Sequence, residues 1–162
     1  RIESKEGKGT MFEIVFPLIA ASHMDAVSEK KELSTANGEG KTILVIDDEV
    51  SLIELLEDIL PEVNFKVISA LDPLKGIEIY RRDQKNIAMV ILDYSMPIMD
   101  GKGAFEELLK INKDVKVLLC SGYTEEETMS VFGIDRPTGY FQKPYKPEAL
   151  VQRVAEIISK DR

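Results

Sequence analysis

The sequence predicts an α/β fold in which helices cover both faces of a parallel sheet of five strands. Two observations predict it. From Lys41 onward, short apolar segments alternate five times with segments whose apolar residues repeat at helical spacing. The apolar segments are hydrophobic on consecutive residues, which is typical of strands buried on both faces. We therefore expect a doubly wound domain with right-handed crossovers and a site at the carboxyl ends of the strands.

Each predicted element has its own signal. The first strand is the run from Ile43 to Ile46, and Leu52 to Leu60 then repeat at helical spacing. Pro147 begins the last helix, where its missing N–H is tolerated. The fourth helix reads as short and is interrupted by Gly133. The strands are predicted at 43–46, 65–68, 89–92, 115–120 and 140–141, and the helices at 52–60, 73–82, 103–111, 125–132 and 147–159.

Composition and charge exclude several classes of function. The 162 residues are 44% hydrophobic and carry a formal net charge of −8, which argues against a nucleic-acid or anionic-membrane surface. No apolar run approaches the roughly 18 residues of a membrane span. One cysteine, Cys120, and one histidine, His23, exclude a disulfide framework and a metal site built on Cys or His. We expect this chain to lie in the cytoplasm. The expectation also holds if the chain belongs to a longer parent protein that is anchored in a membrane.

The first 40 residues differ in texture from the rest. Residues 11–16 alternate as one strand with nothing nearby to pair with, after a hinge formed by Gly7 and Gly9. Residues 20–40 read as a flexible linker without apolar periodicity, and residues 22–24 within it resemble a cloning remnant.

Charged and polar side chains that could act at one site follow the predicted strands. Asp47 and Asp48 end the first strand, Asp93 the third and Ser121 the fourth, and Lys143 follows the fifth. Three carboxylates that converge on one crevice repel one another unless a cation offsets them. Because every ligand is an oxygen, Mg²⁺ fits best. A lysine and a hydroxyl opposite the metal would complete a site for a tetrahedral anion, as phosphoryl transfer requires.

Each of these groups also has a plainer interpretation. Acidic residues favour helix N-termini, which is sufficient for Glu49, and Asp100 before Gly101 is the expected N-cap of the third helix. Taken singly, Ser121 could bond its own backbone and Lys143 could be a solvated charge. All four strand ends, however, carry the required group. We expect Cys120, Met89 and Met129, like most of the aromatic side chains, to lie in the core.

These residues also carry a resemblance to a known family. The sequence is similar to the receiver domains of two-component response regulators over residues 41–162. This resemblance implies a flavodoxin-like sheet with strand order 2-1-3-4-5. The motifs that carry it, in the order and spacing of that family, are ILVIDDE at 43–49, LDYSMPIMDG at 92–101, SGY at 121–123 and YFQKP at 140–144.

The resemblance implies a role for each matching residue. Asp93 would be the phosphoacceptor, with Lys143 paired to the phosphoryl group through a usually cis Lys143–Pro144 bond. Mg²⁺ would be held by Asp47, Asp48, Asp93 and the backbone carbonyl of Ser95. Ser121 and Tyr140 would form the conformational switch, in which Ser121 bonds a phosphoryl oxygen and Tyr140 turns inward.

The resemblance also implies the partner. The donor would be a phosphohistidine, on a histidine kinase domain or on a His-containing phosphotransfer protein. Such a domain catalyses its own phosphorylation and dephosphorylation, and a carboxylate nucleophile such as Asp93 needs no general base. The sequence leaves the oligomeric state open.

A second resemblance covers residues 1–17. Two glycines, Gly7 and Gly9, followed by alternating apolar residues look like the last glycine box and final strand of a histidine-kinase ATP-binding domain. It implies that residues 1–19 are a remnant of that domain and that the chain is the C-terminal piece of a hybrid histidine kinase. No kinase activity is expected, because the phosphoacceptor-histidine box and the other nucleotide boxes are missing.

Three rival functions fit the sequence less well. A haloacid-dehalogenase-type phosphatase needs an aspartate two positions after the nucleophile, where Ser95 stands. A flavodoxin-like cofactor module needs a phosphate-binding loop after the first strand, where Asp47, Asp48 and Glu49 would repel a phosphate. A receiver that serves only as an unphosphorylated docking module is disfavoured because no site residue is missing.

Overall fold

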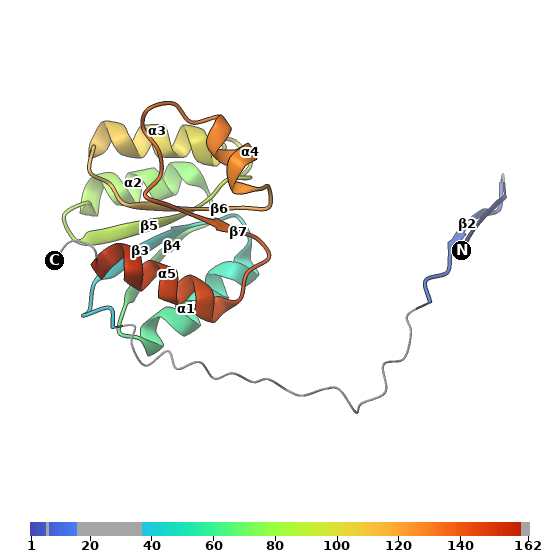
Figure 1. Ribbon diagram of the computed structural model, residues 1–162, viewed down its shortest axis with the longest axis horizontal. Coiled ribbons are helices and arrows are strands. Elements are labelled where there is room, and N and C mark those ends of the chain that lie inside the picture. Colours follow the sequence, from blue (N-terminus) through green and yellow to red (C-terminus); the bar gives the residue numbers. More distant parts are fainter. Residues whose placement is uncertain (6, 16–36, 160–162) are drawn as a thin grey trace. The chain divides into compact units, whose positions relative to one another are not determined.

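The computed structural model describes residues 1–5, 7–15 and 37–159 (Figure 1). The chain divides into two units, residues 1–31 and 32–162. Most of the predicted linker at 20–40, with the suspected cloning remnant at 22–24, lies outside the described residues.

The second unit is a five-stranded parallel sheet, as predicted. The spatial order β4-β3-β5-β6-β7 corresponds to 2-1-3-4-5 when the strands of this sheet are counted from the first. The fold class predicted from the sequence is therefore confirmed. The strands are β3 (Thr42–Ile46), β4 (Lys66–Ala70), β5 (Ile87–Asp93), β6 (Val117–Ser121) and β7 (Gly139–Gln142).

Helices cover both faces of this sheet. Figure 1 shows α1 and α5 on one side and α2, α3 and α4 on the other. The short, weak fourth helix predicted from the sequence ends at Ser130, two residues earlier than expected. The helices are α1 (Val50–Glu62), α2 (Pro73–Asp83), α3 (Gly101–Ile111), α4 (Glu125–Ser130) and α5 (Pro147–Ser159).

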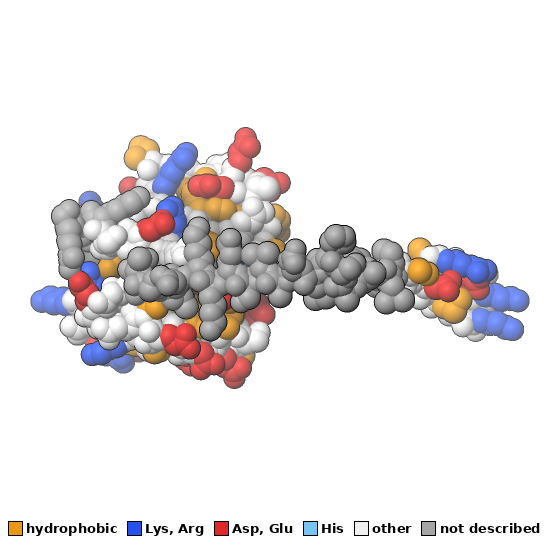
Figure 2. Space-filling model, turned by 60° about the horizontal axis from the view of Figure 1, so that its bottom comes forward, with side chains coloured by type: hydrophobic (Ala, Val, Ile, Leu, Met, Phe, Trp, Pro, Cys, Tyr) orange, Lys and Arg blue, Asp and Glu red, His pale blue; other side chains and the backbone are white. Residues whose placement is uncertain are grey.

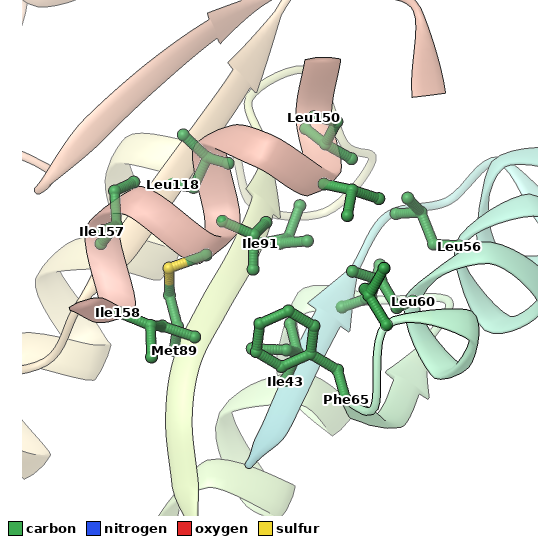
Figure 3. Packing of buried hydrophobic residues seen from close by; sticks show 14 of the residues in the cluster. Ile43, Leu56, Leu60, Phe65, Met89, Ile91, Leu118, Leu150, Ile157 and Ile158 are labelled. Atoms are coloured by element: carbon green, nitrogen blue, oxygen red, sulfur yellow. The ribbon is translucent and has the colours of Figure 1, made fainter. Parts of the chain in front are cut away.

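The core has two parts, one on each side of the sheet. Alternate residues of the central strands point to opposite faces, so that Ile43 and Ile91 pack toward α1 and α5, whereas Leu44 and Leu92 pack toward α2 and α3. Figure 3 shows the first part, in which Leu60 of α1 packs beside Ile43. Because the strands are buried on both faces, their carboxyl ends are the part of the sheet left for function.

Local capping signals determine where the helices begin. Asp100 accepts a hydrogen bond from the Gly103 N–H at 2.8 Å and caps α3, as predicted. Thr124 and Glu127 form a reciprocal capping box at the start of α4. This box positions α4 at the end of β6.

Gly101 allows a close approach beside the carboxyl end of β5. A Cβ atom at this position would lie 2.6 Å from the carbonyl oxygen of Asp93 and 2.7 Å from Cα of Tyr94. The Gly101 N–H donates to the Tyr94 carbonyl at 2.8 Å. The loop after Asp93 therefore returns tightly against the strand end.

The first unit is an antiparallel hairpin of β1 (Ile2–Lys5) and β2 (Gly9–Phe12). The prediction of a lone strand at 11–16 is therefore wrong in its bounds and in its lack of a partner. Gly7 and Gly9 adopt positive φ and form a turn rather than a hinge. The partner strand was missed because β1 is mostly polar and shows no apolar alternation.

Contacts of the second unit begin before the predicted domain start at Lys41. The Gly38 N–H donates to the Val63 carbonyl at 2.7 Å, and the Gly40 N–H donates to the Asn64 carbonyl at 2.8 Å. Residues 37–40 thus hydrogen-bond to the turn between α1 and β4.

The surface carries both signs of charge. In the view of Figure 2, Lys and Arg side chains are interspersed with Asp and Glu, and the described side chains on this face form no continuous basic area. Within the ranges that the structure describes, no helix combines the length and the apolar character needed to cross a membrane.

Candidate functional site

The parallel topology brings the predicted site residues to one edge of the sheet. Asp47 follows the last residue of β3, and Asp93 is the last residue of β5. Ser121 ends β6, and Lys143 directly follows β7. Because β3, β5, β6 and β7 are neighbours and all run in the same direction, these residues lie at the carboxyl edge.

Three carboxylates converge at the centre of this edge. Asp47, Asp48 and Asp93 each offer an oxygen, and these oxygens lie within 4.8 Å of one another. Asp47 and Asp93 are buried, whereas Asp48 is exposed. An all-oxygen donor set with one open side is what a hard divalent cation such as Mg²⁺ requires. The residues present therefore fit a magnesium ion.

Lys143 bridges the two buried carboxylates. Its Nζ lies 2.8 Å from Oδ2 of Asp47 and 2.7 Å from Oδ1 of Asp93, and the Lys143–Pro144 peptide bond is cis. Burial works to lower the pKa of Lys143, but the hydrogen bonds with the two aspartates outweigh it and hold that pKa above its ordinary value. The lysine is therefore a fixed positive charge.

Backbone N–H groups orient the same two carboxylates. The Glu49 N–H donates to Oδ1 of Asp47 at 2.9 Å, and the Ser95 N–H donates to Oδ2 of Asp93 at 2.8 Å. Burial raises the pKa of Asp47, against the lowering effects of Lys143 and the Glu49 N–H. Each carboxylate thus has one oxygen held by the backbone and one held by the lysine.

Ser121 has a different set of partners. Its hydroxyl is buried and accepts hydrogen bonds from the Tyr123 N–H and from the Thr128 hydroxyl, each at 3.2 Å. Tyr140 is half-buried, and its hydroxyl donates to the Tyr123 carbonyl. The two residues predicted to form a switch therefore both bond the loop at Tyr123, and Ser121 also bonds Thr128 of α4.

A pocket of about 270 Å³ opens beside this loop. It is lined by Tyr94, Tyr123, Glu127 and Thr128. The rings of Tyr94 and Tyr123 meet edge to face with centroids 6.3 Å apart. One residue of its lining, Tyr94, directly follows Asp93 in the chain.

Other candidates lie outside the acidic centre. Glu49 is exposed and accepts a hydrogen bond from the Ser51 hydroxyl, which agrees with a role at the start of α1. Ser95 is exposed and contributes the N–H described above; a metal-binding role for its carbonyl stays a prediction. Cys120 is fully buried, and burial raises its pKa to about 12. Burial and the raised pKa both disfavour the reactive thiolate, as expected of a cysteine in the core.

Sequence reasoning missed two hydroxyl groups near the site. Thr128 lies inside α4 and is 2% exposed. Threonine is a weak helix former, and its presence in a predicted helix does not by itself indicate a role in a site. Tyr145 packs edge to face on Phe141, and its buried Oη has no hydrogen-bond partner among the described residues. Burial raises the pKa of Tyr145. Spacing alone gives no signal for either group, because both positions depend on how helices and loops pack.

The fold and the site define a class of protein: an α/β domain with an acidic centre and a bridging lysine at the carboxyl edge of a parallel sheet. Residues 43–155 match the family model of the response regulator receiver domain. The chain therefore belongs to the response regulator receiver family.

Individual relatives agree with this assignment. The chain is 30% identical over 164 residues to the sensor kinase CckA of Brucella abortus, a match that covers 98% of the chain and 17% of the kinase. It is 28% identical to the chemotaxis protein CheY of Treponema pallidum, over 75% of the chain and 85% of CheY. A solved CheX–CheY complex from Borrelia burgdorferi matches with a TM-score of 0.67 and 26% identity, over 72% of the chain and 88% of that protein.

Family membership confirms the resemblance to receiver domains over residues 43–155. It decides against the haloacid-dehalogenase and flavodoxin alternatives, which belong to other classes. The assignment of residues 1–19 to a kinase domain stays a prediction, because the receiver match begins at residue 43.

Proposed function

We propose that this chain is a phosphoacceptor in two-component signalling and that Asp93 receives the phosphoryl group from a phosphohistidine. The observation that carries the proposal is the contact of Lys143 with Asp93 at 2.7 Å, beside two further carboxylates. A carboxylate with a fixed cation on one oxygen and a metal-compatible acidic pair beside it is suited to attack phosphorus.

In the proposed step, an oxygen of Asp93 forms the new O–P bond while the N–P bond of the donor histidine breaks. The electron pair of that bond stays on the imidazole nitrogen. Lys143 offsets the charge on the transferred group, and the N–H of Ser95 holds the second oxygen of Asp93 in place. No proton has to leave the nucleophile, so no general base is needed.

Asp47, Asp48, Asp93 and the carbonyl of Ser95 would hold Mg²⁺. When bound, the ion supplies positive charge next to the transferred phosphoryl oxygens. The Borrelia complex, which contains Mg²⁺ and BeF₃ together with a similar CheY, supports this choice of metal.

The phosphorylated form would be read through Ser121 and Tyr140. Ser121 is the neighbour of Asp93 across the β5–β6 pairing, one residue beyond its register partner Cys120. Capture of a phosphoryl oxygen by the Ser121 hydroxyl would change its contacts with α4, and Tyr140 shares the loop that follows Ser121. Hydrolysis of the aspartyl phosphate at the same site would reset the domain.

The direct test is phosphoryl uptake from a small acyl phosphate. With Mg²⁺ and acetyl phosphate, we expect intact-mass spectrometry to show one phosphoryl adduct, and EDTA should abolish it. A chain without an adduct in Mg²⁺, or with an equal adduct in EDTA, would contradict the proposed function.

The metal ligands can be tested on two neighbouring acids. Asp48→Ala should weaken Mg²⁺ binding at least about tenfold, because Asp48 offers an oxygen to the cluster. Glu49→Ala should leave binding unchanged, because that carboxylate faces Ser51. Calorimetric Mg²⁺ titration of both variants measures the difference, and equal losses would show that the ligand set is misassigned.

The chain would be the C-terminal part of a hybrid histidine kinase, with a kinase remnant at 1–19, a linker at 20–40 and the receiver at 41–162. Two observations support this. The similarity to sensor kinase CckA extends over 98% of the chain, so it includes most of the front segment. Phe12 and Ile14 of that segment are 68% and 74% exposed, although a two-stranded hairpin needs further packing to be stable.

The proposed origin in a hybrid histidine kinase can be tested on the gene. The reading frame upstream of Arg1 should encode the remaining ATP-binding boxes and a phosphoacceptor histidine, and a frame without them would refute it. The phosphoryl donor would then be a kinase domain or a His-containing phosphotransfer protein in the cytoplasm.

A further inference from the structure

Thr128 connects α4 to the strand end that faces the acidic centre. Its side chain is 2% exposed, and its hydroxyl donates to the Ser121 hydroxyl at 3.2 Å within the buried part of the protein. The capping box of Thr124 and Glu127 holds the helix at this position. Thr128 therefore belongs to the site geometrically, although it lies outside the cluster of acids and the lysine.

The hydrogen-bonding capacity of Ser121 shows what its contact with Thr128 can do. A serine hydroxyl has two acceptor lone pairs and one hydrogen. The Tyr123 N–H and the Thr128 hydroxyl both donate to Ser121 Oγ, so together they use its two acceptor positions. What Ser121 has left is its hydrogen, which can only be donated.

The same threonine lies beside the second half of the switch. The hydroxyl of Tyr140 donates to the Tyr123 carbonyl, so its oxygen can only accept a further hydrogen bond. Burial raises the pKa of Tyr140, and a hydrogen bond with Thr128 lowers it in part. The hydroxyl of Thr128 donates to Ser121 in this structure, and Tyr140 is the second acceptor to which its single hydrogen could turn.

We propose that Thr128 is a positioning residue that holds Ser121 as a hydrogen-bond donor toward a phosphoryl oxygen on Asp93. This inference rests on the proposed function of Asp93. When the Thr128 hydrogen bonds Ser121, the Ser121 hydrogen is directed to the phosphoryl group. When Thr128 instead bonds Tyr140, Ser121 can donate to Thr128, and its hydrogen is withdrawn from the site. Phosphorylation thereby favours the arrangement in which Thr128 donates to Ser121. The hydrogen bonds of α4 and of Tyr140 change with it.

The test uses beryllofluoride, a phosphoryl mimic, with Mg²⁺ and the full chain. Thr128→Val keeps the shape of the side chain but removes the hydroxyl, and we expect the half-saturating beryllofluoride concentration to rise about three- to tenfold. Thr128→Ser, which restores a donor, should stay within about twofold of wild type. Calorimetric titration measures both, and Thr128→Ala provides a second variant without the hydroxyl.

A double-mutant cycle separates positioning from packing. In a Ser121→Ala background the Thr128→Val change should have no further effect, because the group that it positions is gone. An unchanged titration in both hydroxyl-deleted variants, or the same fold-loss in the Ser121→Ala background, would overturn the inference. A wild-type chain that binds no beryllofluoride would overturn the proposed function as well, whereas normal wild-type binding confines a failure to Thr128.

Discussion

Asp93→Asn should abolish phosphoryl uptake while leaving the domain folded. The substitution replaces a carboxylate nucleophile by a neutral amide of the same shape. The amide keeps one oxygen, which can replace either the oxygen that accepts from the Ser95 N–H or the one that contacts Lys143, but not both. With acetyl phosphate and Mg²⁺, intact-mass spectrometry should show no adduct in this variant under conditions in which wild type is fully converted.

A matched control lies in the same loop. Asp100 is also an aspartate, but it caps α3 and is not part of the acidic cluster. Asp100→Asn should be phosphorylated like wild type, since asparagine caps helices about as well as aspartate. An undiminished adduct in Asp93→Asn would show that another residue accepts the group.

Lys143→Met should destabilise the metal-free protein by about 2–4 kcal/mol, as expected when one partner of a buried ion pair is removed and the pair is partly open to solvent. The variant leaves Asp47 and Asp93, whose side chains are 4% and 6% exposed, with repelling charges and no lysine. Urea unfolding at neutral pH in EDTA measures the loss. The loss should shrink at lower pH, because burial raises the pKa of Asp47 and a protonated Asp47 no longer repels Asp93. It should also shrink when Mg²⁺ is added.

Lys110→Met provides the comparison for this prediction. Lys110 pairs with Glu107 at 2.6 Å, as close as the pair in the site, but the Lys110 side chain is 70% exposed. Exposed pairs contribute little, so no measurable change in unfolding is expected. Equal losses in Lys110→Met and Lys143→Met would mean that burial of the site does not matter for its electrostatics.

The sequence was sufficient for the sheet because its strands are buried on both faces. Runs such as Ile43 to Ile46 have no other stable place than the centre of a layered fold, and the rule for parallel sheets then locates the site. The hairpin at the front was mispredicted for the opposite reason. Its strands are exposed and β1 is polar. Because neither strand has a buried face, the sequence there shows no alternation of apolar and polar residues that would predict the pair.

The same contrast holds within the site. Asp47, Asp93 and Lys143 were predicted because each stands directly at a strand end, where topology alone fixes its neighbourhood. Thr128 is different, because its contact with Ser121 depends on the direction in which a six-residue helix leaves β6. Helix orientation is determined by tertiary packing, which single-sequence patterns do not encode.

The tyrosines around the carboxyl edge make the protein its own optical probe. The chain has five tyrosines and no tryptophan, so its intrinsic emission comes from tyrosine alone. Tyr94 directly follows Asp93, Tyr140 bonds the loop after Ser121 at Tyr123, and Tyr145 directly follows Pro144. Tyr80 instead bonds Asn112. Ultraviolet fluorescence of the unlabelled chain therefore reports mainly on the signalling end of the sheet.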